Sequence, residues 1–326
     1  MTEMQDLCKK ILLQERRSIA QAITLVESSR QDHRTDALTL LEHLSHSNRQ
    51  ALRIGLSGTP GVGKSTFIES FGLMLIDEGL SVAVLAVDPS STRSGGSILG
   101  DKTRMEKLSR SPQAFIRPSP SLSHLGGVAR RTREAILVCE AANFDIIIIE
   151  TVGVGQSETM VSEMTDLFLL LLAPAGGDEL QGVKRGIMEI ADLIIVNKAD
   201  GELKAAAART QSDYAGALHL LRRRAQDPKG FPKASLASSI SSVGLDQIWK
   251  DIKHLSEWRK SNGWWKKCRK AQSVHWFKSE TRNQLLSVLS DKPGVEEETE
   301  KFSKLVSEEN ISPEAAAERF VAWLKT

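Results

Sequence analysis

The sequence predicts an α/β fold, with a doubly wound, mostly parallel β-sheet and helical extensions at the N- and C-terminal ends. Its short aliphatic runs lack the strict alternation of half-exposed strands, which indicates strands covered by helices on both faces. Helix-like stretches separate these runs, and this alternation of strand and helix is typical of a parallel sheet. The predicted strands are residues 52–56, 82–87, 144–149, 167–172 and 193–196.

Helical patterns flank this central region. In residues 1–50, apolar residues recur three or four positions apart, which predicts amphipathic helices. Near the other end, Ser312 and Pro313 predict the start of a helix, because serine caps helices and proline suits their first position. We therefore predict an N-terminal helical extension at 1–50, a central domain at 51–255 and a C-terminal helical module at 256–326.

Composition and charge exclude several classes of protein. The 326 residues are 40% hydrophobic and 26% charged, and 43 basic against 41 acidic residues leave a net charge of +2. Such a charge argues against capture of the whole protein by nucleic acid or by a membrane surface. No apolar run approaches the roughly 18 residues of a membrane span. The three cysteines lie far apart without a CxxC pair, which predicts reduced thiols in the cytoplasm.

A glycine-rich motif follows the first predicted strand. Residues 58–65 fit the pattern G-x-x-x-x-G-K-[ST], and an apolar helix-like stretch comes next. Glycines allow a tight turn whose N–H groups point at a phosphate, a lysine neutralises the β- and γ-oxygens, and a serine hydroxyl binds Mg²⁺. The motif predicts a P-loop NTPase that binds phosphates through Gly58, Thr59, Pro60, Gly61, Val62, Gly63, Lys64, Ser65 and Thr66.

Acidic residues follow two of the predicted strands. Asp88 comes after residues 82–87, and Glu150 comes after residues 144–149. Asp101 lies in a polar, glycine-rich stretch that resembles a switch loop. Mg²⁺ prefers octahedral oxygen ligands and keeps several waters, so the predicted ligands are Ser65, Asp88, Asp101 and Glu150. The alternative is solvation of a strand end for Asp88 and Glu150, and an ordinary loop residue for Asp101.

A second nucleotide motif follows the last predicted strand. Asn197, Lys198 and Asp200 form the N-K-x-D pattern of GTP-binding proteins. A carboxylate at Asp200 accepts hydrogen bonds from guanine N1–H and N2–H, whereas adenine would leave it unpaired, a mismatch that typically discriminates by about 10⁴ or more. The tetrapeptide alone also fits a charged turn. Its position after a strand and downstream of a phosphate loop favours guanine recognition.

Six motifs together resemble the MeaB/ArgK family of G-proteins, the GTPase chaperones of adenosylcobalamin-dependent acyl-CoA mutases. They span nearly the whole central domain. The motifs are residues 58–66 (GTPGVGKST), 87–104 (VDPSSTRSGGSILGDKTR), 125–134 (LGGVARRTRE), 150–158 (ETVGVGQSE), 174–186 (PAGGDELQGVKRG) and 197–200 (NKAD).

The resemblance implies properties that motif spacing does not establish. It implies binding of GTP, GDP and Mg²⁺, slow GTP hydrolysis, and a homodimer formed through the helical extensions. It also implies that the nucleotide state controls loading of adenosylcobalamin onto a mutase of the methylmalonyl-CoA type and rescue of that mutase. Asp101 would lie in the first switch, Glu150 in the second, and Asp178, Gln181 and Lys184 in a third that contacts the partner. The implied catalytic set is Lys64, Asp101, Glu150 and Lys184.

Two stretches depart from the family pattern. Leu122, Ser123 and His124 replace a small Ser/Arg-Gly-Thr segment before Leu-Gly-Gly. In the last guanine loop, Ser238-Ser239 replaces Ser-Ala. That loop, Ser238, Ser239 and Ile240, still offers backbone N–H groups to guanine O6, so we expect guanine binding to be retained.

Other functions stay open at this point. The phosphate loop also fits a metabolite kinase or ATPase linked to amino-acid transport, although no acceptor-substrate site is recognisable. A scaffold that binds GTP without hydrolysing it is a third hypothesis. The basic, tryptophan-containing stretch at 258–278 fits a dimer seam better than a nucleic-acid surface or a docking site for an acidic patch.

Overall fold

The computed structural model of the chain describes residues 3–28, 30–47, 49–87, 105–118, 125–151, 157–174, 185–221, 224–290 and 292–325. The chain divides into two compact units, residues 1–269 and residues 270–326. The division falls inside a long helix. Among the described helices, none has both the length and the apolar composition that a membrane span requires.

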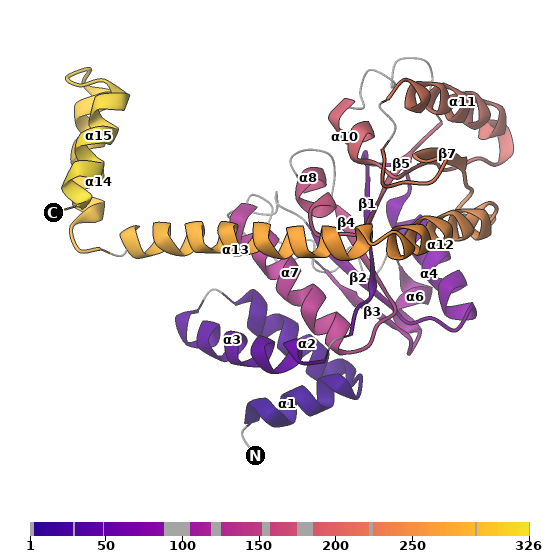
Figure 1. Ribbon diagram of the computed structural model, residues 1–326, viewed down its shortest axis with the longest axis horizontal. Coiled ribbons are helices and arrows are strands. Elements are labelled where there is room, and N and C mark those ends of the chain that lie inside the picture. Colours follow the sequence, from indigo (N-terminus) through magenta and orange to yellow (C-terminus); the bar gives the residue numbers. More distant parts are fainter. Residues whose placement is uncertain are drawn as a thin grey trace. The chain divides into compact units, whose positions relative to one another are not determined.

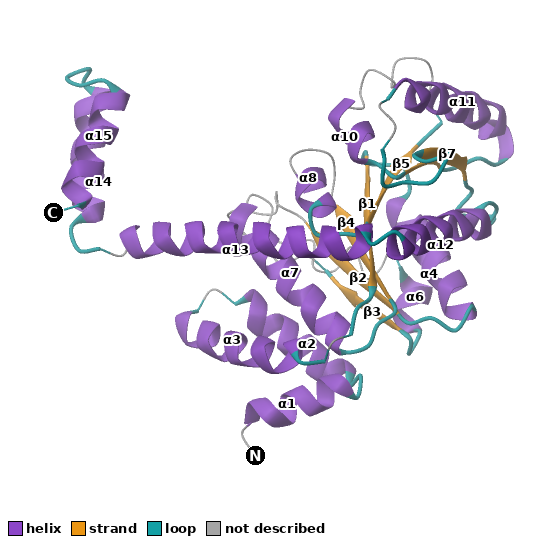
Figure 2. Ribbon diagram, in the orientation of Figure 1, coloured by secondary structure: helices purple, strands orange, loops and turns teal. Residues whose placement is uncertain are grey.

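A single parallel sheet forms the centre of the first unit (Figure 2). Its strands lie in the order β3-β2-β4-β1-β5-β6-β7, and each neighbouring pair is parallel. The predicted doubly wound α/β fold is therefore confirmed. The strands are β1 (Leu52–Gly58), β2 (Val82–Val87), β3 (Ala114–Arg117), β4 (Ile146–Thr151), β5 (Leu167–Leu172), β6 (Leu193–Val196) and β7 (Lys233–Leu236).

The strand prediction missed the two edges of this sheet. β3 and β7 have the sequences AFIR and KASL, and in each a charged residue and other non-aliphatic residues prevent a continuous aliphatic run. Each forms parallel hydrogen-bonded pairs with its inner neighbour, β3 with β2 and β7 with β6. β4 also begins and ends two residues later than predicted, so that Glu150 lies within the strand.

Helices cover both faces of the sheet (Figure 1). α4, α6 and α12 pack on one face, and α7 and α8 pack on the other. The described α-helices are α1 (Glu3–Leu12), α2 (Arg16–Glu27), α3 (Gln31–Ser45), α4 (Lys64–Asp77), α6 (Glu106–Arg110), α7 (Leu125–Ala141), α8 (Ser157–Ser162), α10 (Arg185–Ile190), α11 (Lys204–Leu220), α12 (Leu245–Ser261), α13 (Trp264–Ser290), α14 (Val295–Ser307) and α15 (Pro313–Leu324).

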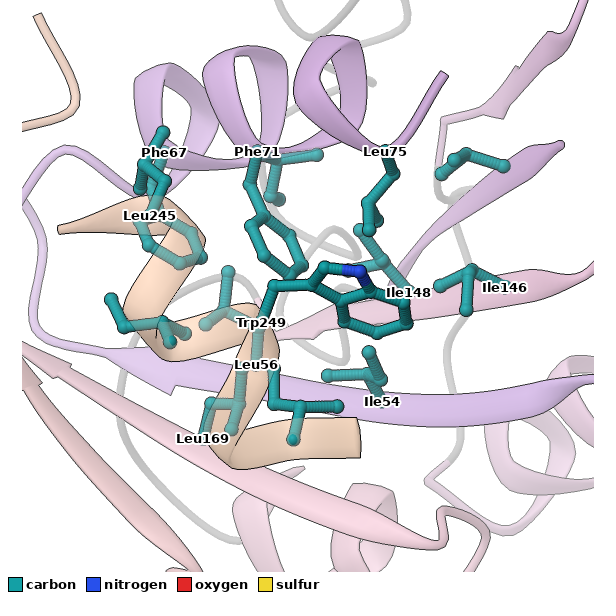
Figure 3. Packing of buried hydrophobic residues seen from close by; sticks show 14 of the residues in the cluster. Ile54, Leu56, Phe67, Phe71, Leu75, Ile146, Ile148, Leu169, Leu245 and Trp249 are labelled. Atoms are coloured by element: carbon teal, nitrogen blue, oxygen red, sulfur yellow. The ribbon is translucent and has the colours of Figure 1, made fainter. Parts of the chain in front are cut away.

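A hydrophobic core lies between the sheet and helices α4 and α12 (Figure 3). Phe67 and Phe71 of α4 stack at 5.4 Å between ring centroids, and Trp249 of α12 meets Phe71 edge-on at 6.3 Å. The indole N–H of Trp249 donates to Glu78 at 2.8 Å, which satisfies its polar atom at the edge of the core. This packing fixes α4, the helix that begins at the phosphate loop.

The N-terminal helices belong to the first unit. α1, α2 and α3 pack against one another, and α2 and α3 also pack against α7. Their apolar stripes are buried, including Ile11, Ile19 and Ile23, as the periodicity predicted. An ion pair of 2.7 Å between Arg34 of α3 and Glu134 of α7 links this helical layer to the sheet-covering helix.

A buried ionic network lies at the amino ends of the central strands. Glu140 accepts hydrogen bonds from the Arg53 guanidinium at 2.9 and 2.7 Å and from Arg269 at 3.0 Å. Arg269 also pairs with Asp166 at 2.6 Å. Burial opposes the charge of Arg269, but the carboxylates of Asp166 and Glu140 outweigh it and raise the pKa of the guanidinium. The network attaches the first turns of α13 to β1 and α7.

The second unit contains the rest of α13 and the pair α14 and α15. Phe302 and Phe320 meet edge-on at 6.2 Å, and Phe320 contacts Trp323 at 5.8 Å between centroids. The Ser312 hydroxyl accepts a hydrogen bond from the backbone N–H of Ala315 at 3.3 Å, and Pro313 follows it. The predicted cap of the last helix is therefore confirmed.

Candidate nucleotide-binding site

The phosphate loop lies at the carboxyl end of β1 and leads directly into α4. Gly63 adopts φ +89°, a conformation that strongly favours glycine. A Cβ atom on Gly58 would lie 2.3 Å from the carbonyl oxygen of Leu171, so no side chain fits there either. Two glycines of this loop therefore cannot be replaced without strain, because the backbone turns tightly there.

Charge and donors converge inside this loop. The Lys64 ammonium group donates to the carbonyl oxygens of Gly58 at 2.7 Å and Thr59 at 3.4 Å. The first hydrogen bond of the turn joins Phe67 N–H to the carbonyl of Gly63 at 2.9 Å. The N–H groups of the first turn of α4 therefore point out of the helix end, where its dipole is positive. Such an end suits a phosphate.

Asn197 connects three loops that are distant in the sequence. It is 1% exposed and follows β6. Its side-chain N–H donates to the carbonyl of Val62 at 2.9 Å, and its oxygen accepts from the N–H and hydroxyl of Ser239 at 3.1 and 2.7 Å. The structure thus brings the phosphate loop, the N-K-x-D segment and the loop after β7 together at the carboxyl ends of the strands.

Lys198 and Asp200 complete the contacts between these loops. Lys198 adopts φ +57° and donates from its ammonium group to the carbonyl of Gly61 at 2.8 Å. The hydroxyl of Ser238 donates to the Asp200 carboxylate and accepts from the N–H of Ser241 at 3.2 Å. Asp200 is thereby held in place beside the loop that follows β7. Ile240, the last residue predicted for that loop, is 83% exposed.

Glu150 lies near the carboxyl end of β4, and Ser65 lies in the first turn of α4, which follows the phosphate loop. Glu150 pairs with Leu56 of β1 in register and is 5% exposed. Because side chains alternate along a strand, Glu150 shares the face of Ile148, which α4 covers. Ser65 is the second residue of α4. Carboxylate and hydroxyl oxygens are ligands that Mg²⁺ prefers, so these two residues would fit such an ion.

Several predicted residues lie outside the described part of the chain. These are Asp88, Asp101 and Lys184, together with Asp178, Gln181 and the departure at residues 122–124. The structure therefore places the phosphate loop, Glu150 and the guanine-loop residues, and it does not place the rest of the predicted metal and switch set.

Two polar contacts near the site were not predicted from the sequence. Thr151 at the end of β4 donates its hydroxyl to Ser57 at the end of β1, at 2.9 Å. Ser70 of α4 donates to the carbonyl of Ser239 at 2.6 Å. Serine and threonine are common at strand ends and in helices. The sequence therefore does not single out these residues, and only their partners, which are distant in the sequence, reveal the contacts.

The three cysteines, His43 and Trp265 have surroundings that indicate structural roles. Burial raises the pKa of the thiols of Cys8, Cys139 and Cys268, which disfavours the reactive thiolate. His43 bonds the carbonyl of Thr39 one turn earlier at 2.7 Å. Across the described stretches, no group of three or more His, Cys, Asp or Glu residues could hold a metal. Trp265 lies under the cations of its own neighbours, Lys260 and Arg269.

Comparisons with known proteins agree on one family. The sequence model of the family called methylmalonyl-CoA mutase-associated GTPase MeaB matches residues 19–294. A putative GTPase of Caulobacter vibrioides is 49% identical over 98% of this chain and 97% of its own length. GTPase ArgK of Escherichia coli is 44% identical over 96% of this chain and 94% of its own length.

A mammalian protein and a solved structure extend the comparison. The mouse protein called methylmalonic aciduria type A homolog, mitochondrial, is 44% identical over 96% of this chain and 77% of its own length. The crystal structure of a LAO/AO transport system kinase has a TM-score of 0.79 and 36% sequence identity, and the match covers 100% of this chain and 99% of that chain.

Proposed function

Because this chain belongs to the MeaB family of GTPases and is therefore a GTP-hydrolysing enzyme, we propose that it is a nucleotide-controlled chaperone of an adenosylcobalamin-dependent acyl-CoA mutase. In this proposal, GTP and GDP states differ in their affinity for the mutase and so gate cofactor loading and rescue. The mutase appears in the description of the matching family, and the mouse relative is named for methylmalonic aciduria. The observation that carries the nucleotide site is the pair of contacts made by the Asn197 side chain, which donates to the carbonyl of Val62 and accepts from the hydroxyl of Ser239.

We assign the nucleotide contacts as follows. Residues 58–66 surround the phosphates, with Lys64 neutralising the β- and γ-oxygens. Asn197, Lys198 and Asp200 face the guanine together with the loop Ser238, Ser239 and Ile240. A base and a phosphate chain bound this way would connect the same loops that Asn197 already joins.

Mg²⁺ is proposed near the carboxyl ends of β1 and β4 and the first turn of α4. Ser65 and Glu150 are its described oxygen donors, and Asp88 and Asp101 are proposed as the others. When bound, the ion would neutralise charge on the phosphate oxygens during hydrolysis. Asp101 and Lys184 stay in the proposed catalytic set with Lys64 and Glu150.

Replacing Asp200 with asparagine is expected to remove most of the preference for GTP over ATP. The carboxylate is the group that pairs with guanine N1–H and N2–H, and an amide can pair with only part of that edge. Competition binding with GDP, ADP and XDP measures the effect, and asparagine is expected to favour XDP. A matched control is Asp213→Asn, on helix α11, where the same change is expected to alter nothing. An unchanged GDP-to-ADP ratio in the Asp200 variant would refute the base assignment.

Replacing Glu150 with alanine is expected to lower kcat by about a hundredfold, which corresponds to about 2.7 kcal/mol of lost stabilisation by the metal ion. The affinity for GDP is expected to change much less, because Lys64 and the helix end still hold the phosphates. Single-turnover phosphate release across a Mg²⁺ titration separates the two effects. Equal losses in kcat and GDP affinity would show that Glu150 supports the fold of the site and not the metal.

The chaperone role predicts slow hydrolysis that a mutase accelerates. A switch biases its partner only through a difference in affinity between two states. The test measures GTP turnover with and without adenosylcobalamin-dependent acyl-CoA mutases, and capture of each mutase in the presence of GDP or a non-hydrolysable GTP analogue. No change in turnover and equal capture would reject the proposal. Transfer of the γ-phosphate to a small molecule would instead favour the metabolite kinase.

A homodimer is also part of the proposal. Val274, Phe277, Leu285 and Val288 of α13 are all exposed large hydrophobic side chains. At 100° per residue they fall within an arc of about 80° on the helix surface, which is typical of a helix–helix seam. A monomer in sedimentation equilibrium at micromolar concentration would contradict it. The proposed location is the cytoplasm, where the three free cysteines stay reduced.

A further inference from the structure

Helix α4 reaches the loop after β7 through a single side chain. The Ser70 hydroxyl donates to the carbonyl oxygen of Ser239 at 2.6 Å, across 169 residues of sequence. Ser239 is 3% exposed, so this contact lies at a closed part of the site. Ser70 lies on α4, the helix that begins at the phosphate loop and that the core packing of Phe67 and Phe71 holds in place.

Three backbone N–H groups of this loop already have acceptors within the protein. The N–H of Ser238 donates to the carbonyl of Val243 at 2.9 Å, and that of Ser239 to the side-chain oxygen of Asn197 at 3.1 Å. The N–H of Ser241 donates to the hydroxyl of Ser238 at 3.2 Å. Among the described residues, the N–H of Ile240 has no acceptor, and Ile240 is solvent-exposed.

The direction of the Ile240 N–H is coupled to Ser70. The carbonyl of Ser239 and the N–H of Ile240 belong to one peptide unit, which is planar and trans. They therefore point in opposite directions. While Ser70 holds the carbonyl toward α4, the N–H of Ile240 points away from α4, on the loop that also holds the Asp200 carboxylate through Ser238.

We propose that Ser70 is a positioning residue for recognition of a purine that carries an acceptor at position 6. Holding the peptide between Ser239 and Ile240 aims one N–H at that acceptor. An adenine presents an amino group at the same position, so the same N–H meets a donor and adenine is rejected. Ser70 thereby adds to base selection at a second edge of the ring, separate from Asp200. The inference rests on the guanine site proposed above.

The test compares GDP with 6-thio-GDP, in which sulfur replaces O6. Sulfur is a weak acceptor, while the N1–H and N2–H groups that face Asp200 are retained. Ser70→Ala is expected to weaken GDP binding by about fivefold, the value of one hydrogen bond. The same change is expected to leave 6-thio-GDP binding nearly unaltered, so the preference for GDP shrinks. Ser70→Thr, which keeps the hydroxyl, is expected to restore the preference.

Two further variants separate positioning from general structure. Ile240→Pro removes the N–H itself and is expected to give the same reduced preference, with no further reduction when combined with Ser70→Ala. Ser261→Ala, which removes a hydroxyl that bonds the carbonyl of Trp258 in its own helix, is the matched control and is expected to change neither affinity. Alanine is favourable inside a helix, so Ser70→Ala is expected to fold.

The outcomes distinguish this inference from the proposed site. If the wild-type protein prefers GDP to 6-thio-GDP and Ser70→Ala keeps the full preference, the role of Ser70 is overturned and the guanine site stands. If Ser70→Ala weakens both nucleotides equally, Ser70 supports the loop without aiming a donor, which also overturns the inference. If wild-type protein shows no preference for guanine over adenine, the site itself is wrong.

Discussion

Replacing Lys64 with alanine is expected to weaken GTP binding by about 3 kcal/mol, which corresponds to roughly a hundredfold higher Kd. In the structure the ammonium group lies over the carbonyls of Gly58 and Thr59, at the mouth of the phosphate loop. Lys198 also reaches the phosphate loop, but its ammonium group is held on the carbonyl of Gly61 and not on those of Gly58 and Thr59. The missing charge is therefore not replaced by a neighbour. Calorimetric titration with a non-hydrolysable GTP analogue and Mg²⁺ measures the loss.

Two controls show whether the loss belongs to the phosphates. Guanosine, which has no phosphates, is expected to bind the Lys64 variant as it binds the wild-type protein. Lys204→Ala removes an exposed lysine from the start of α11 and is expected to leave all affinities unchanged. Equal weakening of guanosine and the GTP analogue would mean that the variant disrupts the loop, and an unchanged Kd for the analogue would remove Lys64 from the site.

Replacing Glu140 with alanine is expected to destabilise the first unit by about 3–5 kcal/mol, the usual cost of breaking a buried ion pair from one side. The side chains of Glu140 and Arg53 are each 5% exposed, and Arg269 contacts the same carboxylate. The substitution leaves two buried guanidinium groups with one carboxylate, Asp166, near them. For a unit of this size the expected fall in Tm is on the order of 10 °C.

A matched glutamate separates burial from charge. Glu106 pairs with Arg110 on the surface, where its side chain is 65% exposed. Glu106→Ala is expected to change stability by less than about 0.5 kcal/mol, because exposed ion pairs contribute little. High salt is expected to leave the Glu140 effect in place, since buried pairs are screened only weakly. A Tm for Glu140→Ala equal to that of Glu106→Ala would show that the network contributes nothing to stability.

The central strands and the nucleotide motifs were predictable because their signals are local. β2, β5 and β6 are continuous aliphatic runs, and their predicted limits agree with the structure. The phosphate loop is a contiguous pattern, and it occurs in the predicted context between β1 and α4. The fold class followed from the alternation of strands and helices, the family followed from the contiguous motifs, and GTP hydrolysis followed from the family resemblance; the comparisons confirm all three.

The edges of the sheet and the contacts around the site depend on distant partners. β3 and β7 become strands only because β2 and β6 offer them a ladder. Ser70 is one of many serines until the fold places it against Ser239, and Glu140 is an ordinary helical glutamate until Arg53 and Arg269 reach it.

For this protein, the sequence by itself determined which segments are strands at the centre of the sheet and which residues have the chemistry to hold phosphate and guanine. Only the tertiary structure decided which of those loops touch and which buried charges neutralise one another. The physical reason is that hydrophobic periodicity and turn geometry act over a few residues, whereas hydrogen bonds and ion pairs are set by distances in space after the chain has folded.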